Sequence, residues 1–136
     1  MIGAMSRIFV IVSGVLGFTA VALGAFGAHG LRSRLGSLPD GVKRLEWWTT
    51  AAHYHLTHAL ALAFVAWLAH RGAGASASVA GWSFVAGVTL FSGSLYLMTL
   101  TGQTKLGAIT PIGGLLLLVG WGAVVVAGFR LAGADG

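Results

Sequence analysis

Residues 8–28 read IFVIVSGVLGFTAVALGAFGA, an apolar run that contains no charged side chain. A helix of about 20 residues crosses the ~30 Å hydrocarbon layer of a bilayer, so this run is long enough to span it. Similar runs cover about residues 48–69, 77–100 and 106–131, with no Lys, Arg, Asp or Glu in their interiors. Backbone groups in lipid must bond within their own segment, and none of the runs alternates as a membrane strand would. The sequence therefore predicts an all-α, polytopic membrane protein with four transmembrane helices in an antiparallel bundle.

The chain as a whole, residues 1–136, is expected to form this single transmembrane domain. The one sizeable connection, residues 31–47, holds six of the eleven charged side chains. Within it, LPDG at 38–41 is a turn signal, and VKRLEWW at 42–48 predicts a short interfacial helix that leads into the second span. Trp47 and Trp48 are typical of the aromatic belt at the level of the lipid headgroups.

The composition fits a membrane protein and excludes several other classes. Hydrophobic residues make up 57% of the chain and charged residues 8%, against about 25% charged in a typical soluble domain. The absence of cysteine excludes disulfides, thiolate metal sites and iron–sulfur clusters. The net charge of +5 comes from basic residues scattered near the ends of the apolar runs. That pattern predicts contact with the lipid bilayer and no nucleic-acid partner.

The distribution of basic residues predicts the orientation. The side of the two outer loops carries five basic residues and the side of the termini carries three: Arg32, Arg34, Lys43, Arg44 and Lys105 against Arg7, Arg71 and Arg130. By the positive-inside rule the termini are expected on the non-cytoplasmic side of the inner (cytoplasmic) membrane. The first run is longer than the apolar core of a usual signal peptide and is expected to stay in the protein.

Small residues recur on single faces of the predicted helices and are expected to mark helix contacts, because association in lipid depends on close van der Waals approach. The glycines assigned to packing are Gly17, Gly24, Gly27, Gly87, Gly93, Gly113 and Gly120. A nucleotide-binding loop is excluded, because GAFGAHG at 24–30 follows no strand and has no acidic residue about 20 positions on in a βαβ context.

The second span begins with an unusually polar segment, TTAAHYHLTH at 49–58. At 100° per residue, six polar residues occupy an arc of about 140°, with His55 apart from them. These six are Glu46, Thr50, His53, Tyr54, Thr57 and His58. Exposure of such a face to lipid is costly, so it is expected to turn toward the bundle.

Other spans offer partners for this face at the same depth. On the third span, the residues Thr89, Ser92, Tyr96 and Thr99 fall within about 80° of one another. The end of the first span and the start of the fourth lie on the same side. Together the four spans are expected to form a polar intramembrane cluster at one end of the bundle, made of His29, Tyr54, His58, Ser92, Ser94, Tyr96 and Thr110.

Three interpretations of this cluster remain open. It is a network of hydrogen bonds that stabilises the bundle, a metal or haem site built on imidazoles, or a path for protons or a small polar solute. Against a metal or haem, the spans contain no carboxylate and no paired histidines of a b-type cytochrome, so no metal ligand and no cofactor is assigned. No catalytic residue is assigned either, because FSGS at 91–94 lacks the strand–turn–helix context of a nucleophile elbow.

Three blocks of this sequence together resemble a known family. They are GAFGAHGL at 24–31, TAAHYHLTHALAL at 50–62, and LFSGSLYLMTLTG with LGAITPIGG at 90–114. In this order and spacing the chain resembles the DUF423 family of small integral membrane proteins. The resemblance implies a four-helix membrane protein. It does not imply an activity. The positions that match the family's pattern are Gly24, Gly27, His29, Tyr54, His58, Ser92, Gly93, Ser94, Tyr96, Thr110, Pro111, Gly113 and Gly114.

The expected function follows from the small extramembrane mass. A chain of this kind is expected to act with partners, as an accessory or scaffold subunit of a larger membrane assembly or as a homo-oligomer. The alternatives are a small transporter or channel for protons or a polar solute, and a haem- or metal-binding redox protein.

Overall fold

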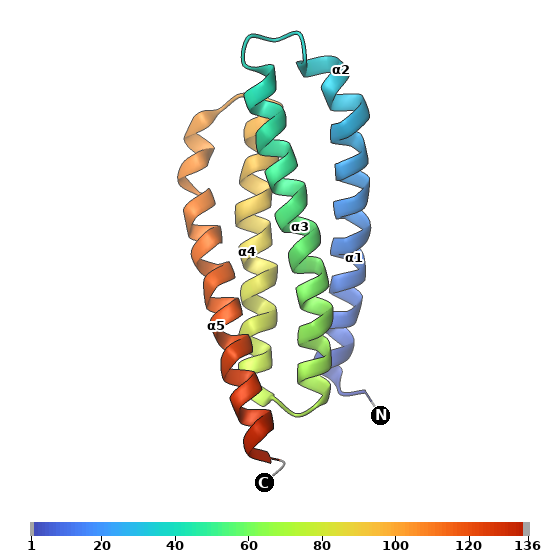
Figure 1. Cartoon of the computed structure of the whole chain (residues 1–136), viewed down its shortest axis with the longest axis vertical. Helices are drawn as coiled ribbons and strands as arrows, with labels where there is room; N and C mark the ends of the chain where they lie inside the picture. Colours follow the sequence, from blue (N-terminus) through green and yellow to red (C-terminus); the bar gives the residue numbers. More distant parts are fainter. Residues whose placement is uncertain (1, 135–136) are drawn as a thin grey trace.

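Four long helices run up and down beside one another in the computed structural model, which describes residues 2–134, with side chains to Leu131 (Figure 1). These helices are α1 (Ala4–Phe26), α3 (Gly41–His70), α4 (Gly74–Thr101) and α5 (Thr110–Ala134). Shorter elements link them, and the described residues include no strand. The all-α prediction is therefore confirmed.

Each long helix packs against its neighbour in the chain. Helix α3 lies between α1 and α4, and α4 lies between α3 and α5. Within the described residues, α1 and α5 are not packed as neighbours, so the bundle is open along one side (Figure 1). The centre is filled by buried apolar side chains from all four long helices, among them Phe9, Leu62, Phe84 and Leu117. The middle two helices therefore contribute most of the core, and the outer two expose long apolar faces.

The connection between α1 and α3 is short and largely helical. Helix α1 continues through one π-helical turn, Gly27–Leu31, into a short helix α2, Arg32–Leu35. After a brief turn α3 begins at Gly41, where a side chain would collide with the carbonyl group of Leu35. Residues 42–48, expected as a short interfacial helix that leads into the second span, form the first two turns of α3, and no break in the hydrogen-bonded helix separates them from the rest.

The other connections are tight turns that rely on glycine. Gly72 and Gly74 have φ of 89° and 59°, and Gly102 has φ of 71°, in the left-handed region that other residues rarely adopt. A single 3₁₀ segment, Thr104–Ala108, follows Gly102 and leads to α5. Pro111 lies in the first turn of α5, where its missing N–H leaves no hydrogen bond unmade.

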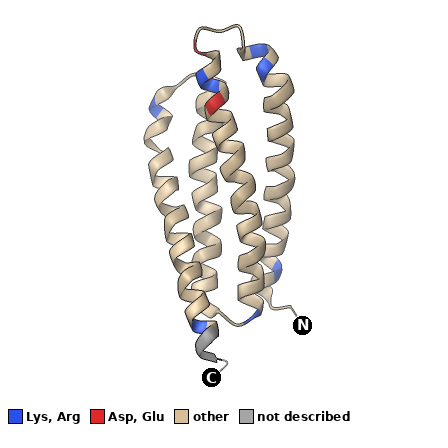
Figure 2. Cartoon of the chain, in the orientation of Figure 1, with Lys and Arg blue, Asp and Glu red and all other residues tan. Residues whose placement is uncertain are grey.

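Charged residues lie at the two ends of the helices and leave a long uncharged middle (Figure 2). Three described segments are long and apolar enough to cross a membrane: Ala4–Leu35, Gly74–Thr101 and Thr104–Leu131. Helix α3 is as long as these, at 30 residues, yet it is not in this set. The histidines and threonines in its first half lower its mean hydropathy, so the structure supports three of the four expected spans by composition.

Candidate functional site

The polar side chains between the helices mostly donate to backbone carbonyl groups of the next helix. Along the α1–α3 contact, the hydroxyl of Ser6 donates to the carbonyl of Ala66 at 2.7 Å, and that of Ser13 donates to the carbonyl of Ala59 at 2.9 Å. The two serines are seven residues apart, and so are the two acceptors, as expected for antiparallel helices that stay in contact over two turns.

The α1–α3 contact ends near the π-helical turn that follows α1. The indole N–H of Trp48 donates to the carbonyl of Leu23 at 2.8 Å. The ring fills the space beside Gly27, where any Cβ would overlap it, and meets the ring of Phe26 edge-on at a centroid distance of 5.7 Å. Gly27 therefore lets α1 approach α3 closely, with the buried Trp48 as its partner.

His55 joins three helices. Its Nε2 lies 3.2 Å from the hydroxyl of Thr19 on α1, and its Nδ1 lies 3.2 Å from the hydroxyl of Tyr96 on α4. The Thr19 hydroxyl also donates to the carbonyl of Val15 at 2.9 Å, so toward His55 it can only accept. With Nε2–H donating to Thr19, a neutral imidazole accepts at Nδ1 from the hydroxyl of Tyr96.

His58 occupies a second, separate environment. Its Nδ1 lies 2.7 Å from the carbonyl of Tyr54, which can only accept, and its Nε2 receives the indole N–H of Trp121 on α5 at 3.2 Å. This pattern also defines a neutral imidazole, with the proton on Nδ1. The ring of Phe84 packs edge-on against His58 at 5.3 Å between centroids. His58 thus links α3 to α5 across a pocket of aromatic rings.

Two further sets of contacts hold α4. The hydroxyl of Ser92 donates to the carbonyl of Ala51 on α3 at 2.9 Å. On the opposite side, the hydroxyls of Ser94 and Thr110 lie 2.7 Å apart and join α4 to the first turn of α5. Ser92 and Ser94 are both buried but point to different helices.

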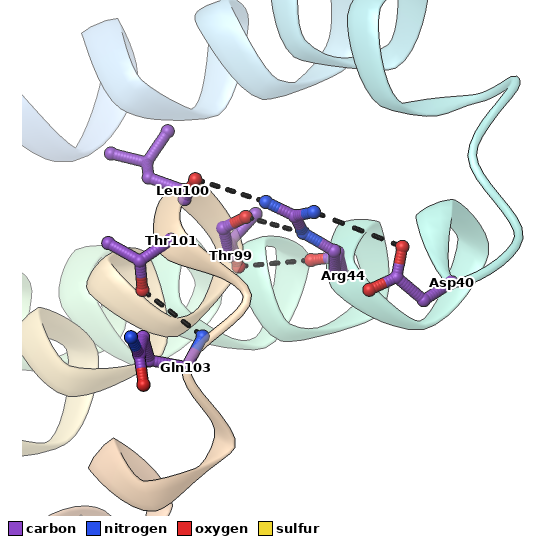
Figure 3. Close-up of polar contacts among 6 residues, drawn as sticks. All are labelled: Asp40, Arg44, Thr99, Leu100, Thr101 and Gln103. Atoms are coloured by element: carbon purple, nitrogen blue, oxygen red, sulfur yellow. Dashed lines mark hydrogen bonds and ion pairs between the residues drawn. The ribbon is translucent and has the colours of Figure 1, made fainter.

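The largest polar contact lies at the loop end, where α3 begins and α4 ends (Figure 3). The guanidinium of Arg44 donates through Nε to the carbonyl of Thr99 at 2.7 Å and through Nη2 to that of Leu100 at 3.0 Å. In return the hydroxyl of Thr99 donates to the carbonyl of Arg44 at 3.0 Å. The last carbonyls of a helix have no partner within it and carry partial negative charge, so a cation is stabilising there. An ion pair with Asp40 at 3.9 Å is a minor addition, because that carboxylate side chain is 55% exposed.

The predicted cluster is therefore divided among several contacts. Tyr96 belongs to the His55 junction, Ser92 to the α3–α4 contact, Tyr54 and His58 to the aromatic pocket, and Ser94 with Thr110 to the α4–α5 contact. These groups lie between the loop end and the middle of the helices, not at one extreme end. His29 is exposed in the π-helical turn and joins none of these contacts in the described structure, because that turn directs it away from α3.

The expected direction of the polar face of α3 is wrong in part. Of its six residues only His58 is buried, and Glu46, Thr50, His53 and Thr57 are exposed, with Tyr54 39% exposed. His55, which the angular count set apart, is 6% exposed. The reason is the packing order: among the described residues, α1 and α4 cover α3 on two sides, and no other helix lies over the remaining face.

The predicted packing glycines also divide into two groups. A Cβ at Gly87 would overlap Leu117, a Cβ at Gly113 would overlap the backbone of Phe91, and a Cβ at Gly120 would overlap the ring of Phe84. These three glycines therefore allow α4 and α5 to approach closely. Gly81, which lies against Phe9, does the same for α1 and α4, but it was not among the predicted packing glycines. A Cβ at Gly17, Gly24 or Gly93 would meet nothing within 4 Å, so the expected close contact is absent at these three. Periodicity places residues on a face, but it does not identify which face has a neighbour.

The arrangement offers little to a metal or haem. Both ring nitrogens of His55 and both of His58 are engaged in hydrogen bonds, which leaves no free lone pair on either ring. Among the described residues no three His, Cys, Asp or Glu side chains come together as a metal site. Every buried side-chain nitrogen and oxygen in the described part of the chain has a hydrogen-bond partner.

Sequence reasoning missed several residues that join the helices. Arg44 was assigned to the interface as an ordinary charge, and Thr19, Trp121 and Ser6 were not assigned. The seven-residue spacing of Ser6 and Ser13, which places both on one face of α1, is the signal that could have identified that contact. Arg44 and Trp121 have no such repeated spacing on their own helices, so the sequence does not mark them as contacts between helices.

Comparison with known proteins gives a consistent result. The family model described as "Protein of unknown function (DUF423)" matches residues 23–114. The UPF0382 membrane protein YwdK of Bacillus subtilis is 46% identical over 125 residues, which cover 91% of this chain and 98% of that protein. A UPF0382 membrane protein of Staphylococcus epidermidis is 39% identical over 127 residues, 93% of this chain and 99% of the relative. No solved structure matches the chain.

Proposed function

Since this chain belongs to the DUF423 family and its relatives are membrane proteins, we propose that it is a four-span protein of the cytoplasmic membrane that works by association. Its first partner is a second copy of itself, and the resulting dimer serves as a scaffold or accessory subunit of a larger assembly. The observation that carries this proposal is the uncovered polar strip on α3, formed by Thr50, His53 and Thr57.

The depth of the strip makes lipid an unsuitable neighbour for it. With a rise of about 1.5 Å per residue, α3 is about 45 Å long, and His53 and Thr57 lie about 18 and 24 Å from its start at Gly41. A hydrocarbon layer of ~30 Å centred on this helix includes both residues. We find no hydrogen bond from either side chain to the described residues, whereas the neighbouring His55 and His58 are fully bonded. Polar groups in that position are stabilised by a protein partner.

The exposed face of α3 leaves room for such a partner. Among the described residues α1 and α4 cover α3 on two sides, and the face that carries the strip stays uncovered. Beyond Thr57 the same face continues with Leu60, Phe64 and Trp67, which are 66%, 47% and 50% exposed. The strip is therefore polar toward the loop end and apolar toward the termini, so only its first half requires hydrogen-bonding groups.

A second copy matches this strip by symmetry. A two-fold axis along the membrane normal places each residue opposite residues of the same depth in the partner. His53 and Thr57 each have groups that donate and accept, so the strip complements itself without a charge in the hydrocarbon layer. An unrelated subunit would have to present matching polar groups at that depth.

In the orientation proposed for the four spans, the connection 31–40 and the α4–α5 turn lie in the cytoplasm. The start of α1 and the end of α5 lie outside. Five basic residues at the first end against three at the other support it (Figure 2). Transport of protons or a small solute receives less support, because the buried polar side chains are hydrogen-bonded to neighbouring groups of the bundle.

Cysteine crosslinking tests the proposal cleanly, because the chain has no cysteine of its own. In native membranes under mild oxidation, Thr57→Cys is expected to give a band of twice the monomer mass. The matched control is Val15→Cys, on the outer face of α1 and 56% exposed, which is expected to stay monomeric. A Thr57→Cys protein that stays monomeric would refute self-association through α3, and a crosslink to a protein of another mass would replace the second copy by a different subunit.

A further inference from the structure

A groove opens at the loop end between α2 and the first turns of α3. Its volume is about 720 Å³, and its lining includes Arg32, Leu45, Glu46 and Thr49. Directly beside it, a second hollow of about 560 Å³ runs between α1 and α3 and shares Arg32, Leu45 and Thr49 with the first. Both volumes fall in the range of sites that hold small molecules. The shared lining makes them two parts of one groove, which we name the α1–α3 groove.

The two parts of the groove differ in chemistry. The part at the loop end has one cation, Arg32, and one anion, Glu46. The part that runs along α1 and α3 is lined mainly by apolar groups such as Val21, Ala25 and Leu56. A polar end with both signs of charge, followed by an apolar channel that points into the membrane, is complementary to an amphiphile.

The charges of the groove are available to a ligand. Among the described residues the one ion pair joins Arg44 to Asp40, so neither Arg32 nor Glu46 is paired within the chain. Both side chains are exposed and lie at the end of the molecule where the charged residues gather, at the level of lipid headgroups (Figure 2).

We propose that the α1–α3 groove binds one phospholipid whose headgroup carries a primary amine, such as phosphatidylethanolamine. Its phosphate pairs with the guanidinium of Arg32, which suits two oxygens of one phosphate. Its ammonium group donates to the carboxylate of Glu46. One acyl chain lies along Val21, Ala25 and Leu56.

The charge pattern separates this lipid from related ones. A lipid with a net negative headgroup and no amine would satisfy Arg32 but place its charge beside Glu46. A choline headgroup is cationic but has no N–H to donate to the carboxylate. Free inorganic phosphate would leave the apolar part of the groove empty. The lipid site goes beyond the proposed self-association, since the groove lies beside the strip of α3 and shares Thr50 and His53 with it but not Thr57.

Thermal unfolding of the purified, delipidated full chain in detergent tests the proposal. The additions are phosphatidylethanolamine, phosphatidylglycerol, phosphatidylcholine and inorganic phosphate, each over a range of concentrations. Phosphatidylethanolamine is expected to raise the midpoint at concentrations about tenfold lower than the other two lipids, the ratio that one charge-assisted hydrogen bond supplies. Inorganic phosphate is expected to have no effect.

Variants assign the effect to the groove. Arg32→Ala is expected to abolish the response to phosphatidylethanolamine, and Glu46→Gln to make that lipid no better than phosphatidylglycerol. Arg34→Ala, an exposed arginine in the same short helix that does not line the groove, is the matched control and keeps the wild-type response. Ala25→Leu fills the apolar part while both charges remain, and it is expected to weaken binding of all three lipids.

An equal response to the three lipids, or an equal loss in Arg32→Ala and Arg34→Ala, would overturn the proposal. Retained dimer formation of Thr57→Cys in the Arg32→Ala background separates the two proposals, because the strip on α3 does not include Arg32. Failure of the Thr57→Cys crosslink in the chain that keeps Arg32, together with an intact lipid response, would refute self-association alone.

Discussion

Replacing Arg44 by alanine is expected to destabilise the protein more than the loss of any other charged side chain. Its side chain is only 12% exposed, and its guanidinium is bound to the carbonyls of Thr99 and Leu100 at the end of α4. Each hydrogen bond to a charged group contributes about 1.5–3 kcal/mol. Because the bond to Leu100 is exposed to solvent, we expect the variant to lose about 2–4 kcal/mol of unfolding free energy in total.

Three further variants separate the guanidinium from charge in general. Arg44→Lys keeps the charge but presents one donor group where two carbonyls are bound, so it is expected to lose about 1–2 kcal/mol. Lys43→Ala removes the same charge from the neighbouring position, where the ammonium lies 5.6 Å from the Trp47 ring, and is expected to lose less than about 1 kcal/mol. Asp40→Asn is expected to lose at most about 0.5 kcal/mol, because the ion pair is long and exposed.

The assay is reversible unfolding in mixed detergent micelles, followed by helical circular dichroism at increasing SDS. The reasoning would be refuted if Asp40→Asn were as damaging as Arg44→Ala, because the ion pair would then be the dominant contact. It would also be refuted if Lys43→Ala matched Arg44→Ala. Coupling between Arg44→Ala and Thr99→Val in a double-mutant cycle is expected to be about 0.5–2 kcal/mol, because each residue bonds the backbone of the other.

The remaining predictions concern contacts within the bundle and use the same assay. Gly113→Ala is expected to lose about 1–3 kcal/mol of unfolding free energy, because its Cβ would overlap the backbone of α4. Gly93→Ala, with open space around it, is expected to gain about 0.5–1 kcal/mol. Equal effects of the two variants would show that the α4–α5 approach is looser than described. Trp121→Phe leaves Nε2 of the buried His58 without a donor and is expected to lose about 1–3 kcal/mol, and no loss would mean that this hydrogen bond is not formed. Ser13→Ala removes one hydrogen bond between helices and is expected to lose about 0.6 kcal/mol, the average for such bonds in membranes, with a loss above about 2 kcal/mol contradicting the assignment.

Much of the fold follows from the sequence because its signals are local. An apolar run of sufficient length must be helical in lipid, since each backbone N–H then finds a carbonyl four residues away. Length and composition therefore predicted the helices and their antiparallel order, and the small residues Gly87, Gly113 and Gly120 predicted where α4 and α5 approach. Turn residues located the connections within a few positions.

The site was predicted less well, because phase within one helix does not say which face has a neighbour. The six polar residues of α3 share an arc as predicted, yet most of that arc is exposed, since α1 and α4 cover other sides of α3. For the same reason His55, set apart by the angular count, proved to be the residue that joins three helices. The order of packing between helices depends on contacts summed over the whole bundle, and no single segment contains that information.

Sequence alone thus determined that this chain is helical, apolar in its long segments and a member of a membrane protein family, because each of these properties depends on residues close together in the sequence. Tertiary structure alone decided which polar groups are satisfied inside the bundle and which face outward. A hydroxyl or imidazole in a membrane helix is satisfied only if a carbonyl, hydroxyl or indole from another helix lies within about 3 Å, and that distance exists only once the helices have packed.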